Sequence, residues 1–252
     1  MDYFVEKDSI VRTIWGKSDT ILFVFAGAAA EFALNKAVDW LYFTGRLPAQ
    51  PLDRLFSTVS YARKIIFSEK EKALQIIDSI TSIHKVVETN RQKAIPDWAY
   101  KDVLYMLIHY TMSSYEVLER KLTLKEKEEI FDVFYRFGIR MNIIKLPATY
   151  SKWIEQRKED MENDLIESDY TIDLFKQYKK HLGRIRYFLL IEGQKLIIPE
   201  RVRELLHFKK TSALSLILPF YKLSRLIHLD NFIKRLILPK KYQLEIFALD
   251  VV

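Results

Sequence analysis

Apolar residues recur at helical spacing along almost the whole chain, and this periodicity constrains the fold more than any other feature of the sequence. Apolar positions spaced three and four residues apart form one face of a helix. The periodic stretches are separated by isolated glycines and prolines, and no Asn-Gly or Asp-Gly hairpin turn occurs. We therefore predict an all-α protein that forms a single-domain multi-helix bundle over residues 1–252.

The predicted central helix is the most apolar one. Ser18 and Asp19 are suitable N-caps for a helix that runs from Thr20 to about Thr44, where Gly45 would end it. Its first half is apolar on all sides, which is expected of a helix in the middle of a bundle. Further helices are predicted at about 9–16, 52–67, 68–91, 96–122, 123–138, 150–167, 168–183, 199–207, 212–228 and 231–238.

Local signals define several of these helix starts. Ser68 and Glu71 have the spacing of a capping box, as do Thr123 and Glu126, in which the two residues satisfy each other's backbone amides. Thr149 is a suitable N-cap for the helix that follows it. Residues 184–198 fit either short strands or fragments of helix.

Basic residues are concentrated near the C-terminus. Between residues 176 and 243 the chain has sixteen Lys and Arg residues but four acidic residues, so we expect residues 183–252 to form a basic C-terminal helical layer. No nucleic-acid-binding motif accompanies this charge, and we expect no nucleic-acid partner. Peripheral contact with an anionic membrane surface, or with an acidic partner, suits such a layer. A solvated basic face is the alternative.

Several classes of site are excluded by composition and motif. The chain has no cysteine, which excludes disulfides, thiolate-ligated haem, cysteine-based zinc sites and a cysteine nucleophile. It has no Gly-rich nucleotide-binding motif. Asp2 and Glu6 precede any long apolar run, so we expect no signal peptide. The longest apolar run, Ile21 to Ala30, is shorter than the ~20 residues of a spanning helix, and we expect a cytoplasmic protein, soluble or peripheral at the membrane.

Among the five histidines, His84 has the most apolar helical neighbours. Ile77, Ile80 and Val87 share its face of the predicted helix. A buried imidazole needs a partner, because an unpaired buried polar group costs about 1–3 kcal/mol. A haem iron is one such partner, since it binds a neutral imidazole among aliphatic side chains. A core histidine that is hydrogen-bonded to another side chain is the alternative.

Two further groups of polar residues are candidates for a site. Arg54, Ser57, Thr58 and Tyr61 fall on one face of their helix and could hold a propionate, a carboxylate or bound oxygen if that face lines a core. An ordinary, partly exposed helix face is the alternative. His109 lies on a mixed face that suits either a cavity wall or a structural hydrogen bond.

A series of segments then follows in a distinctive order. These segments are Phe25–Ala33, Arg54–Thr58, Ile65–Leu74, Ile83–Val87, Leu107–Ser114 and Leu146–Thr149. In order and spacing, over about residues 10–182, the chain resembles the helical domain of the family that contains the bacterial rubber oxygenase (latex-clearing protein) and the mycophenolic acid pathway oxygenase. Gly27 and Ala28 replace a His-Pro dipeptide that is common in the family.

The resemblance implies a haem-b-dependent oxidoreductase of the oxygenase type, which uses O2 on an apolar, isoprenoid-like or lipid substrate. It implies that His84, in the Ile-His-x-x-Val motif, is the axial ligand of the haem iron. Arg54 and Thr58 match the family's Arg-x-x-x-Thr pair beside the haem, with Ser57 where the rubber enzyme has a lysine. His109 matches a second family histidine. Arg54, Thr58 and His109 are thus expected catalytic residues, and Arg54, Ser57, Thr58 and His84 are expected to bind the cofactor.

Two other readings of the sequence stay open. The chain could be a non-enzymatic haem carrier or sensor, built on the same axial histidine. It could also be a haem-free protein in which His84 packs in the core and the basic C-terminal layer binds a partner or a membrane surface.

Overall fold

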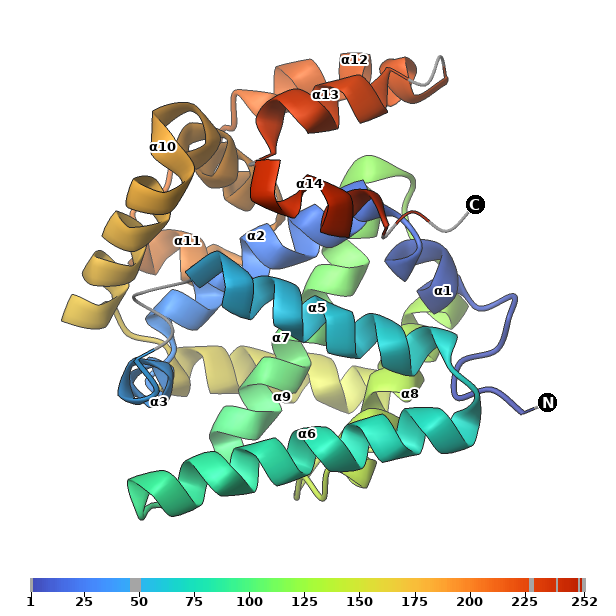
Figure 1. Ribbon diagram of the computed structural model, residues 1–252, viewed down its shortest axis with the longest axis vertical. Helices are drawn as coiled ribbons and strands as arrows, with labels where there is room; N and C mark the ends of the chain where they lie inside the picture. Colours follow the sequence, from blue (N-terminus) through green and yellow to red (C-terminus); the bar gives the residue numbers. More distant parts are fainter. Residues whose placement is uncertain (1, 46–50, 227–228, 239, 249, 251–252) are drawn as a thin grey trace.

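The computed structural model describes residues 2–45, 51–226, 229–238, 240–248 and 250; for residues 51–57 and several residues of the C-terminal helices, it describes the backbone alone. The prediction of an all-α protein is confirmed (Figure 1). In chain order the helices are α1 (Ile10–Trp15), α2 (Ser18–Leu34), α3 (Val38–Phe43), α5 (Pro51–Phe67), α6 (Lys70–Arg91), α7 (Asp97–Leu118), α8 (Leu124–Arg140), α9 (Tyr150–Asp164), α10 (Asp169–Ile197), α11 (Glu200–Leu205), α12 (Leu214–Leu226), α13 (Asp230–Ile237) and α14 (Lys240–Phe247). Across the described ranges, β pairing is limited to isolated bridges.

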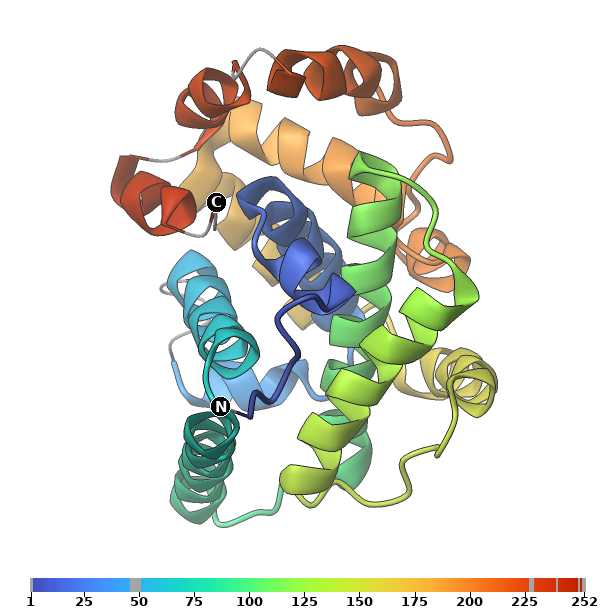
Figure 2. The ribbon, with the colours of Figure 1, turned by 90° about the vertical axis from the view of Figure 1, so that its right-hand side faces the viewer.

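Helix α2 forms the centre of the bundle, as its all-round apolar character predicts. Its most extensive contacts are with α7 and α10. Figure 2 shows α2 in the middle, with α5 and α6 on one side, α7 and α8 on the other, and the C-terminal helices above. Ile21, Ala30 and Leu34 are fully buried there, because a helix surrounded by other helices has no face left for water.

The central helix is shorter than predicted. It ends at Leu34, and α3 is a separate short helix. Asn35 causes the break: its side-chain oxygen accepts a hydrogen bond from the Ala37 amide at 2.9 Å, and its side-chain nitrogen donates to Asp102 at 2.6 Å. A side chain that bonds to the backbone two residues on offers an alternative to the helical pattern, so the chain turns here before Gly45.

The predicted N-caps have mixed outcomes. The Thr123–Glu126 capping box is confirmed in both directions, and Thr149 caps α9. The Ser68–Glu71 box is wrong, since α6 begins at Lys70 and its N-cap is Glu69 without a side-chain cap. The N-terminal segment satisfies the start of α6 instead, because the Lys70 amide donates to the carbonyl of Asp2 at 3.0 Å.

Residues 184–197 are helical, which resolves the ambiguity in the sequence. They continue α10 beyond Gly183, which has φ 72° and ψ 175° and joins two helical pieces. This backbone conformation is open to glycine and strained for other residues. Gly183 therefore changes the direction of α10 instead of ending it. The sequence did not predict α14, which follows the last predicted helix.

The C-terminal helices α12, α13 and α14 form a layer over one end of the bundle (Figure 1). Helix α12 packs on α10, and α13 packs on α12. The side chain of Lys234 on α13 reaches Ser18 at the start of α2, at 3.0 Å. None of the helices within the described ranges is both long and apolar enough to cross a bilayer.

Candidate functional site

His84 lies on the inward side of α6, near its C-terminal half. Its imidazole is half-buried and packs edge-on against the ring of Tyr100 on α7, with the ring centroids 5.2 Å apart. The Tyr100 hydroxyl donates to Glu88 at 3.3 Å, which fixes the ring that the imidazole touches. On the same face, Ile80 packs against the main core and Val87 against a smaller cluster around Trp40. The predicted apolar surroundings of His84 are therefore present on this face.

The opposite face of α6 is also partly apolar. Ile83 and Val86 point outward and are exposed, so apolar character at this end of α6 is not confined to the core side. Two exposed aliphatic side chains are ordinary for a protein surface, and they contribute nothing to the surroundings of the imidazole.

Helix α5 packs beside α6 in an antiparallel hairpin (Figure 1). The side chains of Arg54 and Ser57 lie outside the described residues. Thr58 is exposed and Tyr61 is half-buried, whereas Val59, on the other face, is buried. The expectation that this polar stripe faces a core is therefore wrong at Thr58, which reaches solvent.

The residues around His84 fit one kind of cofactor better than another. No group of three or more His, Asp or Glu residues comes together within the described part of the chain, as a metal ion held by protein side chains alone would need. Haem needs a single neutral imidazole from the protein, in largely apolar surroundings. His84, half-buried between Ile80 and Val87, is one imidazole in such surroundings.

His109 lies on the same helix as Tyr100 but on its opposite side. They are nine positions apart, which makes two and a half helical turns and about 13 Å of rise. His109 accordingly faces away from α6, and its Nε2 lies 3.4 Å from the carbonyl oxygen of Ile197 on α10. The structure thus does not bring His84 and His109 into one site.

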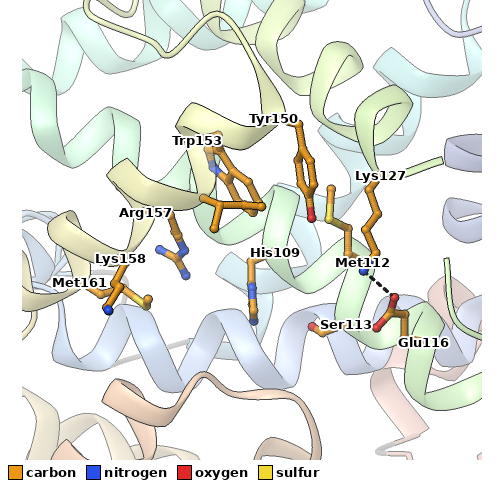
Figure 3. Close-up of a pocket in the computed structure, with 11 residues that line it drawn as sticks. His109, Met112, Ser113, Glu116, Lys127, Tyr150, Trp153, Arg157, Lys158 and Met161 are labelled. Atoms are coloured by element: carbon orange, nitrogen blue, oxygen red, sulfur yellow. Dashed lines mark ion pairs between the residues drawn. The ribbon is translucent and has the colours of Figure 1, made fainter. Parts of the chain in front are cut away.

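A cavity of about 380 Å³ opens beside His109, between α7, α8 and α9 (Figure 3). Its apolar walls include Met112, Tyr150, Trp153 and Met161. An ion pair between Glu116 and Lys127, at 2.9 Å, lies at one side of it. The volume falls in the range of small-molecule sites, which are mostly apolar with a few polar groups.

Burial lowers the pKa of His109 to about 4, and the nearby charge of Arg157 acts in the same direction. The imidazole is therefore neutral at physiological pH. In this state it can donate one hydrogen bond and accept another, but it presents no cationic charge to the cavity.

A buried charged cluster adjoins the cavity and includes Arg157, which also lines it. Arg157 Nη2 pairs with Glu31 Oε2 at 2.6 Å, and the Tyr110 hydroxyl donates to the same oxygen at 2.8 Å. All three side chains are almost fully buried. The sequence analysis did not identify this cluster, although Glu31 was a usable signal, since a single acidic residue inside a very apolar helix needs a buried partner.

A second buried acid lies at the other end of α7. Asp102 accepts the hydrogen bond from Asn35 that ends α2. Burial raises the pKa of Asp102 to about 7, although the hydrogen bond from Asn35 opposes this shift. The folded protein therefore retains a proton that the unfolded chain, with a pKa near 3.9, has already released.

We expect the free energy of unfolding to contain a term from Asp102 that falls by about 1.4 kcal/mol per pH unit between about pH 4 and 7. The free energy of unfolding falls as the pH rises because the folded state binds the extra proton over this range. The contribution of Asp102 is therefore largest below the pKa of the unfolded chain. Asp102→Asn should flatten this part of the pH profile in urea unfolding, whereas Asp8→Asn, at an exposed position, should not. Parallel profiles for wild type and Asp102→Asn would contradict the assignment.

Comparison with known proteins places the chain in a family. No curated protein and no solved structure matched it. One family model, described as "ER-bound oxygenase mpaB/B'/Rubber oxygenase, catalytic domain", matches residues 15–229. The match extends past the 10–182 range of the resemblance and includes the positions of Arg54, Thr58, His84 and His109. Because it covers most of the sequence, the chain belongs to the mpaB/rubber oxygenase catalytic-domain family.

Proposed function

We propose that this protein is a haem-b-dependent oxygenase that uses O2 on an apolar substrate such as an isoprenoid or a lipid, and that His84 would hold the haem iron. Membership of the oxygenase catalytic-domain family supports the reaction class. The observation that carries the assignment of the ligand is the inward-facing imidazole, which stands between two apolar clusters and against Tyr100.

The residues around His84 have distinct tasks in this proposal. Haem, when bound, supplies the iron at which oxygen is activated. His84 would hold the iron. Tyr100 would restrict the rotation of the imidazole, because the hydrogen bond to Glu88 fixes the Tyr100 ring. Arg54 is assigned to a haem propionate, since a guanidinium forms strong paired hydrogen bonds with carboxylates. Thr58 is given no place beside the haem, because its side chain is exposed.

His109 keeps a different task. It lies half a turn away from the His84 side of α7, so we assign it to the wall of the cavity rather than to the haem. Its neutral state and the apolar side chains beside it give this part of the cavity wall no charge.

An absorption spectrum tests the proposal. We expect the purified protein to show a Soret band as isolated or after addition of hemin, and His84→Ala to lower its haem affinity by at least about tenfold, since ligand sets of metal sites carry effects of this size. His181→Ala, which removes an exposed histidine, is the matched control and should behave as wild type. Circular dichroism checks that each variant folds.

Three outcomes would contradict the assignment. Folded wild-type protein that stays colourless with hemin would contradict haem binding, and an unchanged spectrum in His84→Ala would contradict the choice of ligand. Loss of the band in His109→Ala alone would assign the iron ligand to His109, beside the cavity. Oxygen uptake with a long isoprenoid or fatty substrate then separates an oxygenase from a haem carrier.

A further inference from the structure

Helix α12 presents its apolar face to the outside of the molecule. Leu216, Ile217, Phe220 and Leu223 are between 55% and 77% exposed. Their spacing places all four on one side of the helix. A soluble bundle normally turns such a face toward its core, so the orientation of α12 needs an explanation.

Polar contacts fix α12 in this orientation. Tyr221 donates its hydroxyl to Asp19 on α2 at 3.3 Å. Arg225 pairs with Glu119 at 2.5 Å and lies 3.5 Å from Asp19. Arg225 lies on the opposite side of α12 from Leu216 and Phe220, whereas Tyr221 lies at the edge of the apolar side, one turn after Ile217. Rotation of the helix would separate both ion pairs of Arg225.

Helix α13 repeats the arrangement. Phe232 is 60% exposed, and Leu229 just before the helix is 48% exposed. On the other side, the Lys234 side chain is only 4% exposed and pairs with Asp250 at 3.1 Å. The two helices pack against each other at the outer end of the bundle (Figure 1). We call the six exposed residues on them the α12–α13 apolar face; they are Leu216, Ile217, Phe220, Leu223, Leu229 and Phe232.

The charge around this face selects among its possible occupants. Lys209 and Lys210 are exposed a few residues before α12, where Lys210 also pairs with Glu200 at 2.8 Å, and Arg235 and Lys240 are exposed on and after α13. A second copy of the same surface would bring like charges together, which disfavours self-association. Apolar side chains with a basic surround are instead typical of surfaces that lie in the interface of an anionic bilayer.

We propose that the α12–α13 apolar face inserts into the interfacial region of a membrane that contains anionic lipids. The partly buried ion pairs hold the apolar residues outward, and the basic residues contact the lipid headgroups. Contact at the interface needs no spanning helix, which agrees with the lengths and composition of the described helices. This proposal does not depend on haem binding or on the reaction.

Vesicle co-sedimentation of the full chain tests the proposal. We expect binding to phosphatidylcholine vesicles with 30% phosphatidylglycerol (about a third anionic lipid), weaker binding to pure phosphatidylcholine, and a decline as salt rises. Leu216→Ser with Phe220→Ser should lower the affinity for anionic vesicles at least about tenfold, because it removes two large side chains from the lipid. Leu124→Ser with Ile139→Ser removes exposed apolar residues of α8 and is the matched control.

A fluorescence measurement locates the insertion. With anionic vesicles, Phe220→Trp should gain a blue-shifted component that Leu124→Trp does not gain, since only the first residue would leave water. Binding that survives Leu216→Ser with Phe220→Ser, equal binding to neutral vesicles, or no binding at low salt would each overturn the proposal. A dimer in sedimentation velocity that becomes monomeric in the serine variant, without vesicle binding, would assign the face to self-association instead.

Discussion

Gly27→Ala is expected to destabilise the protein by about 1–2 kcal/mol, although alanine is the better helix former by about 1 kcal/mol. A Cβ at position 27 would lie 2.2 Å from two ring carbons of Tyr110 and 2.9 Å from Ile197. The ring cannot move aside easily, because it is fully buried and its hydroxyl is bonded to Glu31. Overpacking of this kind costs about 1–3 kcal/mol or more, which exceeds the gain in helix propensity.

Gly193→Ala is the control for this prediction. Gly193 is also buried in a helix, but a Cβ there would contact only Phe23, at an ordinary 3.7 Å. We expect this variant to be as stable as wild type or more stable by up to about 1 kcal/mol. Urea unfolding of both variants decides the matter: a Gly27→Ala protein at least as stable as Gly193→Ala would show that α2 and α7 are not packed this closely.

Glu31→Leu is expected to cost about 3–5 kcal/mol, because it leaves the buried guanidinium of Arg157 without a counter-charge. It also removes the acceptor of the Tyr110 hydroxyl. The double variant Glu31→Leu with Arg157→Met should recover most of this stability, since replacing a whole buried ion pair with apolar side chains is often neutral or stabilising. Thermal or urea unfolding of the two variants measures the recovery.

An exposed ion pair provides the comparison. Asp132 and Arg136 pair at 2.8 Å on the surface of α8, with both side chains more than 40% exposed. Asp132→Asn should change the free energy of unfolding by about 0.5 kcal/mol or less. If Glu31→Leu were as mild as Asp132→Asn, or if Arg157→Met gave no recovery, the charged cluster would not be the buried pair described above.

Helix positions were largely predictable because they depend on local patterns. Apolar periodicity identified most helices, and the Thr123 capping box depends on residues three apart in the chain. The break at Asn35 was not predictable, because it depends on Asp102, which is 67 residues away in sequence. The start of α6 was missed for a similar reason, since the residue that bonds to its first amide is Asp2.

The candidate site shows the same division between local and long-range information. The inward face of α6 at His84 follows from its helical neighbours, and the family was recognisable from the order of its segments. The exposure of Thr58 was not visible, because it depends on how α5 is placed against its neighbours. Two histidines 25 residues apart were both assigned to one function, and only the rotation of α7 shows that they face different sides.

Helix α7 therefore separates the surroundings of His84 from the cavity beside His109. Tyr100 closes one side against the imidazole of His84, and His109 forms part of the wall on the other. If His84 binds haem iron as proposed, the body of this helix would separate that iron from a small molecule in the cavity. Such a molecule would not compete with a ligand of the iron. Binding in the cavity would affect the surroundings of His84 only if α7 moved.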